Sequence, residues 1–224
     1  MRKLGILFIL GIFCCSLLIA KAKDPISFLI HNKGKNTILK KTNTDELKLE
    51  LARHVVLSDE HPSLVWDNLG NRFNYELTVG SSKYMVPPSN EDTVSVKIKP
   101  FQNTAAVSIK VFRDSKLITE LAPCGNRGFP KKHSVRWMTD SETEMFNQVL
   151  QTRSRDHSGN LLMIGNYLEQ KEMWVAAMNY YQQYLTDNPD EIEMAPYLFR
   201  VYKKLKLKKI YHKELTIWVT AMKE

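Results

Sequence analysis

The sequence predicts an α+β fold of two segregated domains, an antiparallel β-sandwich followed by a small all-α domain. From Ile26 to Leu121 the apolar residues mostly alternate with polar ones, which is the period of a strand with one buried face. After residue 138 the apolar residues return every three or four positions, which is the period of an amphipathic helix. The change of period places the domain boundary in the loop 122–138.

The N-terminus has the pattern of a secretory signal peptide. Arg2 and Lys3 precede a long apolar run, which ends in the small-x-small triplet Ala20-Lys21-Ala22. We therefore predict cleavage before Lys23, which would remove residues 1–22.

Two alternatives for the N-terminus stay open. The apolar run is short for a membrane span, but it would serve as an anchor if it were not cleaved. Cys14 or Cys15 would carry lipid in a lipoprotein, although Ile12 and Phe13 are bulky where a bacterial lipobox has small residues. Either alternative would associate the protein with a membrane.

Composition favours an exported protein of a bacterial envelope. The chain has 224 residues, with 32 Lys and Arg against 24 Asp and Glu, and it stays mildly basic without the signal peptide. Of its 3 cysteines only Cys124 would remain after cleavage, which excludes an intrachain disulfide. An exported chain without disulfides fits a bacterial envelope better than a eukaryotic secretory route. We expect the protein in the periplasm or at a membrane face of the envelope.

Alternating segments predict the strands of the sandwich, to which we assign residues 23–122. In each segment every second side chain is apolar, so one face of the strand is buried. Turn signals separate the segments, and Arg-Asp-Ser-Lys at 113–116 joins two strands as a hairpin. The segments are ELKLEL (46–51), FNYELTV (73–79), TVSVKIK (93–99) and AVSIKVF (106–112). Short strands at this spacing are typical of an antiparallel β-sandwich.

The stretch PSLVWDNLGNRFNYELTV (62–79) resembles the B and C strands of fibronectin type III and immunoglobulin-like domains. Trp66 would then be the central core residue, with Tyr75 on the next strand. The cysteine pair of true immunoglobulin domains is absent. The resemblance implies a fold and no activity, because such sandwiches host many functions.

Five helical runs predict the C-terminal domain, to which we assign residues 141–224 after a linker at 123–140. In the first run Glu144 follows Ser141 by three residues, which is the pattern of a capping box. The runs span roughly 141–152, 159–170, 173–187, 193–205 and 207–223.

The stretch from Ser158 to Glu191 resembles a tetratricopeptide repeat. The residues at the family's positions are the apolar Leu161 and Ile164, the small Gly165 and Ala177, the aromatic Tyr181 and the terminating Pro189. Small residues allow two helices to approach closely, and proline cannot continue a helix.

A second, degenerate copy of the repeat begins at Ile192. Leu198, Tyr202 and Leu215 are at matching positions. The copy departs from the family where small residues are expected, at Phe199, Tyr211 and Trp218. Each repeat buries its apolar face only against its neighbours, so two copies need a cap, and helix 141–152 is the candidate.

The resemblance to this repeat implies a scaffold that binds proteins. In the family the first helix of each pair lines an inner groove, and here these helices would expose Asn166, Glu169, Gln170, Arg200, Lys203 and Lys204. Because half of these residues are cationic, the groove would favour acidic or carboxylate-bearing segments. The alternative is that the six residues lie on ordinary solvated helix faces.

No set of residues predicts an active site, a metal site or a cofactor. Cys124 could act as a nucleophile with His133 as its base, but the flanking residues match no cysteine enzyme, and an interchain disulfide is the stronger alternative. The histidines show no ligand spacing, and they are His31, His54, His61, His133, His157 and His212. We therefore expect no enzymatic activity.

The densest basic run is YKKLKLKKIYHK (202–213). It could face anionic lipid or an acidic partner, and export argues against nucleic acid. The interleaved Leu205, Leu207 and Ile210 indicate that the run is the core edge of two packed helices.

These observations predict a non-enzymatic envelope protein that acts as an adaptor or assembly factor through a short helical groove. Its partner would be another envelope protein or a peptide segment, with an acidic segment favoured. The alternative is a module that binds glycan or cell-wall material through the sandwich.

Overall fold

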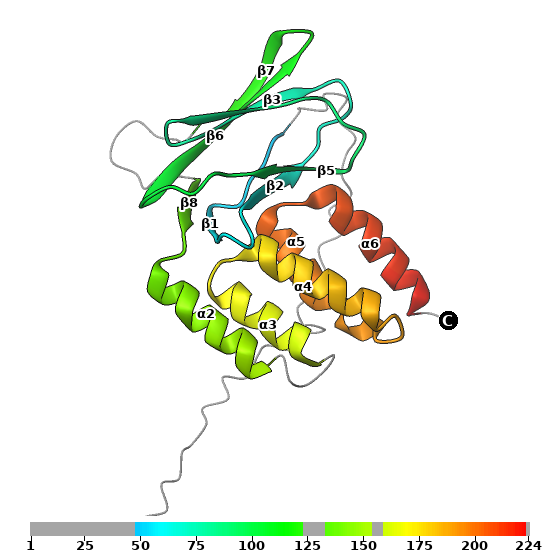
Figure 1. Ribbon diagram of the computed structural model, residues 1–224. Coiled ribbons are helices and arrows are strands. Elements are labelled where there is room, and N and C mark those ends of the chain that lie inside the picture. Colours follow the sequence, from blue (N-terminus) through cyan, green and yellow to red (C-terminus); the bar gives the residue numbers. More distant parts are fainter. Residues whose placement is uncertain (1–47, 123–132, 154–158, 223–224) are drawn as a thin grey trace, which may run out of the picture. The chain divides into compact units, whose positions relative to one another are not determined.

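The computed structural model describes residues 48–122, 133–153 and 159–222, all within the unit Leu39–Glu224 (Figure 1). The predicted signal peptide, Cys124 and the first repeat position Ser158 lie outside the described residues.

In the described part of the chain, eight strands form two sheets. The larger sheet has the order β1-β8-β6-β3-β4, with β7 also paired to β6, and the smaller sheet pairs β2 with β5. The strands are β1 (His54–Leu57), β2 (Ser63–Asp67), β3 (Asn74–Val79), β4 (Ser82–Val86), β5 (Thr93–Lys97), β6 (Thr104–Arg113), β7 (Lys116–Leu121) and β8 (Ser134–Trp137). Among these strands β1 and β8 pair in parallel and the other pairs are antiparallel. The predicted two-domain α+β layout is confirmed.

The two sheets meet through aromatic residues of β2 and β3. Trp66 and Tyr75 are fully buried, and their rings pack edge to face with centroids 5.7 Å apart. The Tyr75 hydroxyl donates to Oδ1 of Asn68 at 2.8 Å and accepts from the backbone N–H of Leu69 at 2.7 Å. The prediction of Trp66 as the central core residue is confirmed.

One predicted strand and one predicted boundary of the sandwich need correction. The described part of ELKLEL forms no strand, although Leu49 and Leu51 are buried, because an extended chain can bury alternate leucines without a pairing partner. The predicted linker 123–140 contains β8, which pairs with β1 and with the start of β6. A strand of 4 residues is too short for its alternation to stand out.

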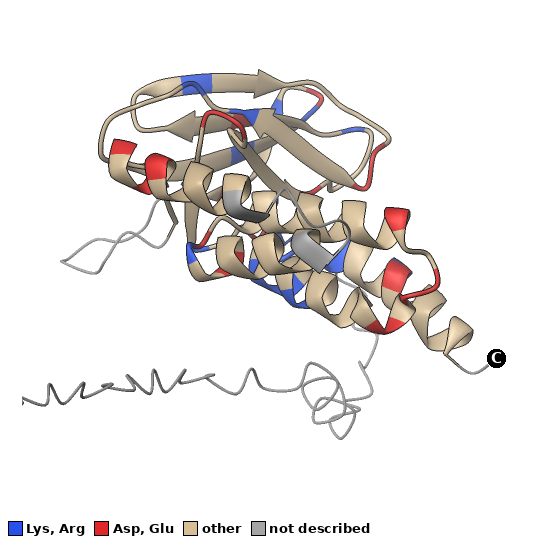
Figure 2. Cartoon of the chain, turned by 60° about the horizontal axis from the view of Figure 1, so that its bottom comes forward, with Lys and Arg blue, Asp and Glu red and all other residues tan. Residues whose placement is uncertain are grey.

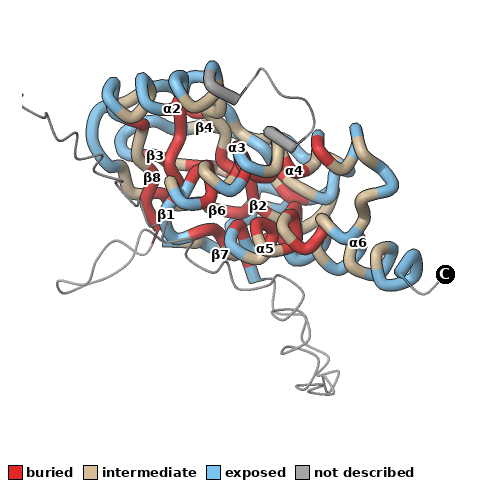
Figure 3. Tube along the Cα trace, turned by 90° about the horizontal axis from the view of Figure 1, so that it is seen from below, coloured by how far each residue is buried: buried red, intermediate tan, exposed pale blue. Residues whose placement is uncertain are grey.

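All five predicted helices are present, and consecutive helices pack against each other from α2 to α6. They are α2 (Asp140–Arg153), α3 (Gly159–Gln170), α4 (Trp174–Asp187), α5 (Ala195–Leu205) and α6 (Lys208–Ala221), with a 3-10 turn, η1 (Ile192–Met194), before α5. Figure 3 shows buried segments of α3, α4 and α5, whereas α6 has no buried residue.

The capping box of α2 lies two residues before the predicted one. The Thr139 backbone N–H donates to Oε2 of Glu142 at 3.0 Å, and the Glu142 N–H donates to the Thr139 hydroxyl at 3.3 Å. These reciprocal bonds are those of a capping box with Thr139 as the N-cap, so the assignment to Ser141 and Glu144 was wrong.

Gly165 allows α3 and α4 to cross closely, as predicted. A Cβ at this position would overlap the ring of Tyr181, which is itself buried. Ala177 on the same helix as Tyr181 is also fully buried. The small residues therefore set the distance between the two helices.

Candidate functional site

The six residues predicted to line a groove lie on α3 and α5. They are Asn166, Glu169 and Gln170 on α3, and Arg200, Lys203 and Lys204 on α5. Asn166, Gln170 and Lys204 are exposed, and Arg200 and Lys203 are half-buried. Glu169 is buried, with 9% of its surface accessible, so the expectation that it is exposed was wrong.

Glu169 is buried because three donors satisfy its carboxylate. Arg200 approaches it with Nε at 2.8 Å from Oε2 and Nη2 at 2.6 Å from Oε1. The Tyr181 hydroxyl donates to Oε1 at 2.7 Å. Burial and the neighbouring negative charge of Glu169 raise the pKa of Tyr181, so this hydroxyl stays protonated as a donor. The ion pair of Glu169 with Arg200 therefore neutralises the charge at the centre of the predicted groove.

The C-terminal end of α5 keeps its positive charge. Lys203 Nζ lies 4.8 Å from the centre of the Tyr211 ring, and Lys204 Nζ lies 5.5 Å from that of Trp174. Lys206 follows the helix in the left-handed region, with φ of 68°. Lys204 and Lys206 are exposed and form no ion pair within the described part of the chain.

The second half of the basic run has a different environment, because it contacts the sandwich. The backbone N–H groups of Lys208 and Lys209 donate to Oδ2 of Asp67, at 2.8 and 3.3 Å. Asp67 of β2 thus caps the N-terminus of α6 from another domain. Lys208 Nζ pairs with Glu50 at 2.9 Å, and Lys213 Nζ pairs with Asp92 at 3.0 Å.

The burial pattern confirms that the basic run is also a core edge. Leu205 and Leu207 are buried, and Ile210 packs against the core. The run therefore divides into lysines that dock α6 on the sandwich and lysines that remain at the end of α5.

A cavity of about 300 Å³, which we name the junction pocket, lies where the end of α5 meets the start of β1. Its charged lining residues are Arg53, Glu172, Lys203, Lys204 and Lys206, and its aromatic ones are His54 and Trp174. Figure 2 shows Lys and Arg positions gathering along the lower edge of the helical layer. The sequence indicated Lys203 and Lys204 for this region, but it held no signal for Arg53, which is about 150 residues away along the chain.

Two hydrogen bonds hold the walls of the junction pocket together. The Trp174 indole N–H donates to the backbone carbonyl of His54 at 3.0 Å. The backbone N–H of Val56 donates to the carbonyl of Glu172 at 3.1 Å. The turn between α3 and α4 is thereby fixed to the edge of β1.

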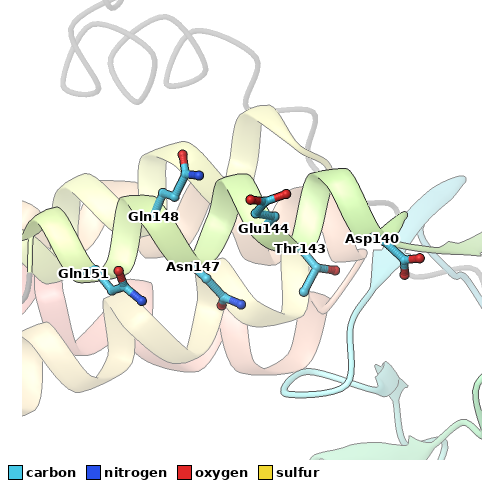
Figure 4. A pocket seen from close by; sticks show the side chains of 6 residues that line it. All are labelled: Asp140, Thr143, Glu144, Asn147, Gln148 and Gln151. Atoms are coloured by element: carbon cyan, nitrogen blue, oxygen red, sulfur yellow. The ribbon is translucent and has the colours of Figure 1, made fainter.

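Of the other hollows on the described surface, two bear on the candidate functions. One of about 480 Å³ runs along α2, and Figure 4 shows its lining side chains, which are Asp140, Thr143, Glu144, Asn147, Gln148 and Gln151. All six come from one helix, so they do not converge on a ligand. The other hollow, of about 340 Å³, lies on the sandwich and includes Tyr84 and Phe101 beside polar residues such as Ser82, Gln102 and Thr104.

The candidate chemistry of the histidines is limited in the described residues. His133 is buried and its Nδ1 lies 3.2 Å from the carbonyl oxygen of Ala52, so it has a structural contact. No three His, Asp or Glu side chains in the described ranges, which contain no cysteine, gather in a way that could hold a metal ion. None of the described helices is long and apolar enough to cross a membrane.

Comparison with protein families gives two matches. Residues 49–127 match the family model of the immunoglobulin-like domain of the magnetotaxis protein MtxA, and residues 140–220 match that of the C-terminal domain of MtxA. No curated protein matches the chain. The immunoglobulin-like part of the predicted fold is confirmed. The chain is therefore similar to the magnetotaxis protein MtxA in both its immunoglobulin-like and its helical domain.

Proposed function

We propose that the protein is a non-enzymatic component of a bacterial envelope that holds another envelope protein, as an adaptor or assembly factor. The observation that carries the proposal is the exposed cationic end of α5, where Lys204 and Lys206 lie beside the half-buried Trp174. Protein interfaces use such aromatic anchors next to charge. The signal-like N-terminus supports the location in the envelope.

The helical domain would be a short tetratricopeptide-like scaffold. Packing of consecutive helices and the close approach at Gly165 and Tyr181 support this description. Each helix in such a scaffold contacts mainly its neighbours, which leaves extended faces for partners. MtxA is described as a magnetotaxis protein. For this chain we propose that it couples two envelope proteins.

Crosslinking in cells tests the proposal. A photoreactive amino acid replaces Asn166 or Gln170, both exposed on α3, and in the control it replaces Lys116, which is exposed on β7. We expect the α3 positions to capture a defined envelope protein that the control position does not capture. Capture of no protein from α3, or recovery of the protein from the cytoplasm, would contradict the proposal.

A second candidate function is recognition of glycan or cell-wall material by the sandwich. The hollow that includes Tyr84 and Phe101 supports it, because aromatic faces beside hydroxyl and amide groups suit sugars. Co-sedimentation with purified peptidoglycan tests this candidate. Binding that Phe101→Ala abolishes would support it, and absence of binding by the wild type would remove it.

A further inference from the structure

The junction pocket has an excess of positive charge that the described residues do not neutralise. Arg53, Lys204 and Lys206 line it together with a single carboxylate, that of Glu172. Arg53, Lys204 and Lys206 are exposed and form no ion pair with other described residues. A concave surface with one dominant sign of charge concentrates the field and attracts ions of opposite sign.

The pocket contains an aromatic wall as well as charge. Trp174 is half-buried, and its indole N–H is occupied by the carbonyl of His54. Its ring therefore keeps one orientation and lies next to the Lys204 ammonium, at 5.5 Å. A fixed indole offers apolar contact area to a ligand at little entropic cost.

Two lining residues of the pocket have a backbone conformation that usually belongs to glycine. Glu172 and Lys206 have φ of 59° and 68°, directly after the turns that end α3 and α5. A residue with a side chain adopts this region less readily than glycine does. Both residues take the left-handed position that commonly ends a helix, since the next backbone N–H, of Met173 or Leu207, bonds back to the carbonyl of Leu168 or Tyr202. The helix ends therefore account for this conformation, and it is the charge and the aromatic wall of the pocket that favour a ligand.

We propose that the junction pocket binds an acidic, extended peptide segment of a partner protein. Carboxylates of the segment would pair with Arg53, Lys204 and Lys206, and its backbone or apolar side chains would lie on Trp174. This inference deepens the proposed function and rests on it, since it names the chemistry of the partner. It also makes the sandwich part of the binding site, through Arg53.

The shape of the pocket favours a peptide over a membrane surface. An anionic bilayer presents a flat array of headgroups, which cannot enter a recess between β1 and α5. Proteins that bind such bilayers usually add exposed apolar side chains. The large exposed hydrophobic residues of the described chain are Met85, Leu117, Met145, Met163, Ile217, Val219 and Met222, and none of them lines this pocket.

Fluorescence anisotropy of the purified protein with a labelled poly-glutamate peptide tests the inference, with poly-lysine as the control peptide. The test variant is Arg53→Glu with Lys206→Glu. The matched control is Lys97→Glu with Lys116→Glu, which makes the same change of net charge at exposed positions of β5 and β7. We expect the wild type to bind poly-glutamate in a salt-dependent manner and the test variant to bind at least about tenfold more weakly.

The control variant should bind poly-glutamate within about threefold of the wild type, because surface charges far from a site act weakly at moderate salt. Equal weakening in both variants would overturn the inference, since net charge alone would then explain binding. Absence of wild-type binding to poly-glutamate would overturn it as well. Binding to phosphatidylglycerol vesicles that the test variant loses, without peptide binding, would assign the surface to a membrane instead.

Crosslinking from Gln170 separates this inference from the proposed function. If the test variant still captures the same envelope protein with full yield, the adaptor function stands and the pocket is not its site. If the wild type captures no protein, the adaptor function itself fails.

Discussion

The two halves of the basic run 202–213 have nearly the same composition and opposite environments. Lys204 and Lys206 are exposed at the junction pocket, whereas Lys208 and Lys213 pair with Glu50 and Asp92 of the sandwich. The difference arises from acidic residues that are more than a hundred positions away in the sequence. The density of lysine therefore does not identify a binding surface, and the position of the acids decides which cations stay accessible.

The comparison predicts that cations with internal partners contribute to stability and that those at the pocket do not. Arg200 belongs to the first class, because it pairs with Glu169, which also accepts a hydrogen bond from Tyr181 inside the helical domain.

Glu169→Gln should have the largest effect. It removes the charge of a buried carboxylate and leaves the Arg200 guanidinium unpaired, which should lower the free energy of unfolding by about 3 kcal/mol. Denaturation in urea measures the loss. Glu172→Gln is the control, because Glu172 is exposed and should change stability by less than about 0.5 kcal/mol. Similar losses in the two variants would contradict the structural role of Glu169.

Glu142→Gln should lower stability by about 2 kcal/mol at neutral pH, since it removes charged hydrogen bonds to Arg136 at 2.7 and 2.9 Å. The bonds to Arg136 lower the pKa of Glu142 to about 2 from 4.5. The carboxylate therefore stabilises the fold above pH 4.5, and this contribution disappears as the pH falls toward 2.

The difference in stability between the wild type and Glu142→Gln should accordingly shrink as the pH is lowered from 5 to 3, about the range in which this carboxyl gains its proton in the unfolded chain. Urea denaturation across that range measures the difference. Glu144→Gln, on the exposed face of α2, is the control and should change stability by less than about 0.5 kcal/mol at neutral pH. A difference that stays constant down to pH 3 would contradict the assignment.

Asp67→Ala should lower stability by about 1 kcal/mol, because α6 loses the acceptor for its first N–H groups. Asp67→Asn keeps a side-chain oxygen acceptor. Because burial raises the pKa of Asp67, its charge is less favourable in the fold than in water, and the neutral amide should be tolerated. If thermal denaturation shows asparagine to be as harmful as alanine, the contact is not a cap.

Lys206→Gly should raise stability by about 0.5 kcal/mol, since glycine relieves the left-handed backbone at this position. The same change should weaken poly-glutamate binding. Glu172→Gly relieves a similar conformation but removes an acid, so it should raise stability and strengthen binding. Loss of stability in both variants would show that the conformation carries no strain.

The sequence predicted the larger features of the fold because long periodic segments determine them. The five helices, the strands β3, β5 and β6 and the core position of Trp66 are examples. Short or locally ambiguous features were not predictable. β8 has 4 residues, and its parallel pairing with β1 depends on a partner about 80 positions earlier in the chain.

The sequence predicted the candidate binding site only where its residues belong to a single helix. The spacing along α5 placed Lys203 and Lys204 at one end of a helix face, which the structure retains. The burial of Glu169 depends on Tyr181 and Arg200 from two other helices, and the proximity of Arg53 depends on the docking of β1. Such contacts arise from tertiary packing, which the spacing of residues within one segment does not reveal.

The most direct test of the division within the basic run compares two pairs of charge-neutralising substitutions. Lys204→Gln with Lys206→Gln changes the pocket. Lys209→Gln with Lys213→Gln changes the contact with the sandwich, because Lys209 Nζ donates to the backbone carbonyl of Asn68 and Lys213 Nζ pairs with Asp92. Stability and poly-glutamate affinity are measured for both. We predict that the first pair loses affinity and keeps its stability, while the second pair loses stability and keeps its affinity. Equal effects of the two pairs on both quantities would contradict the account.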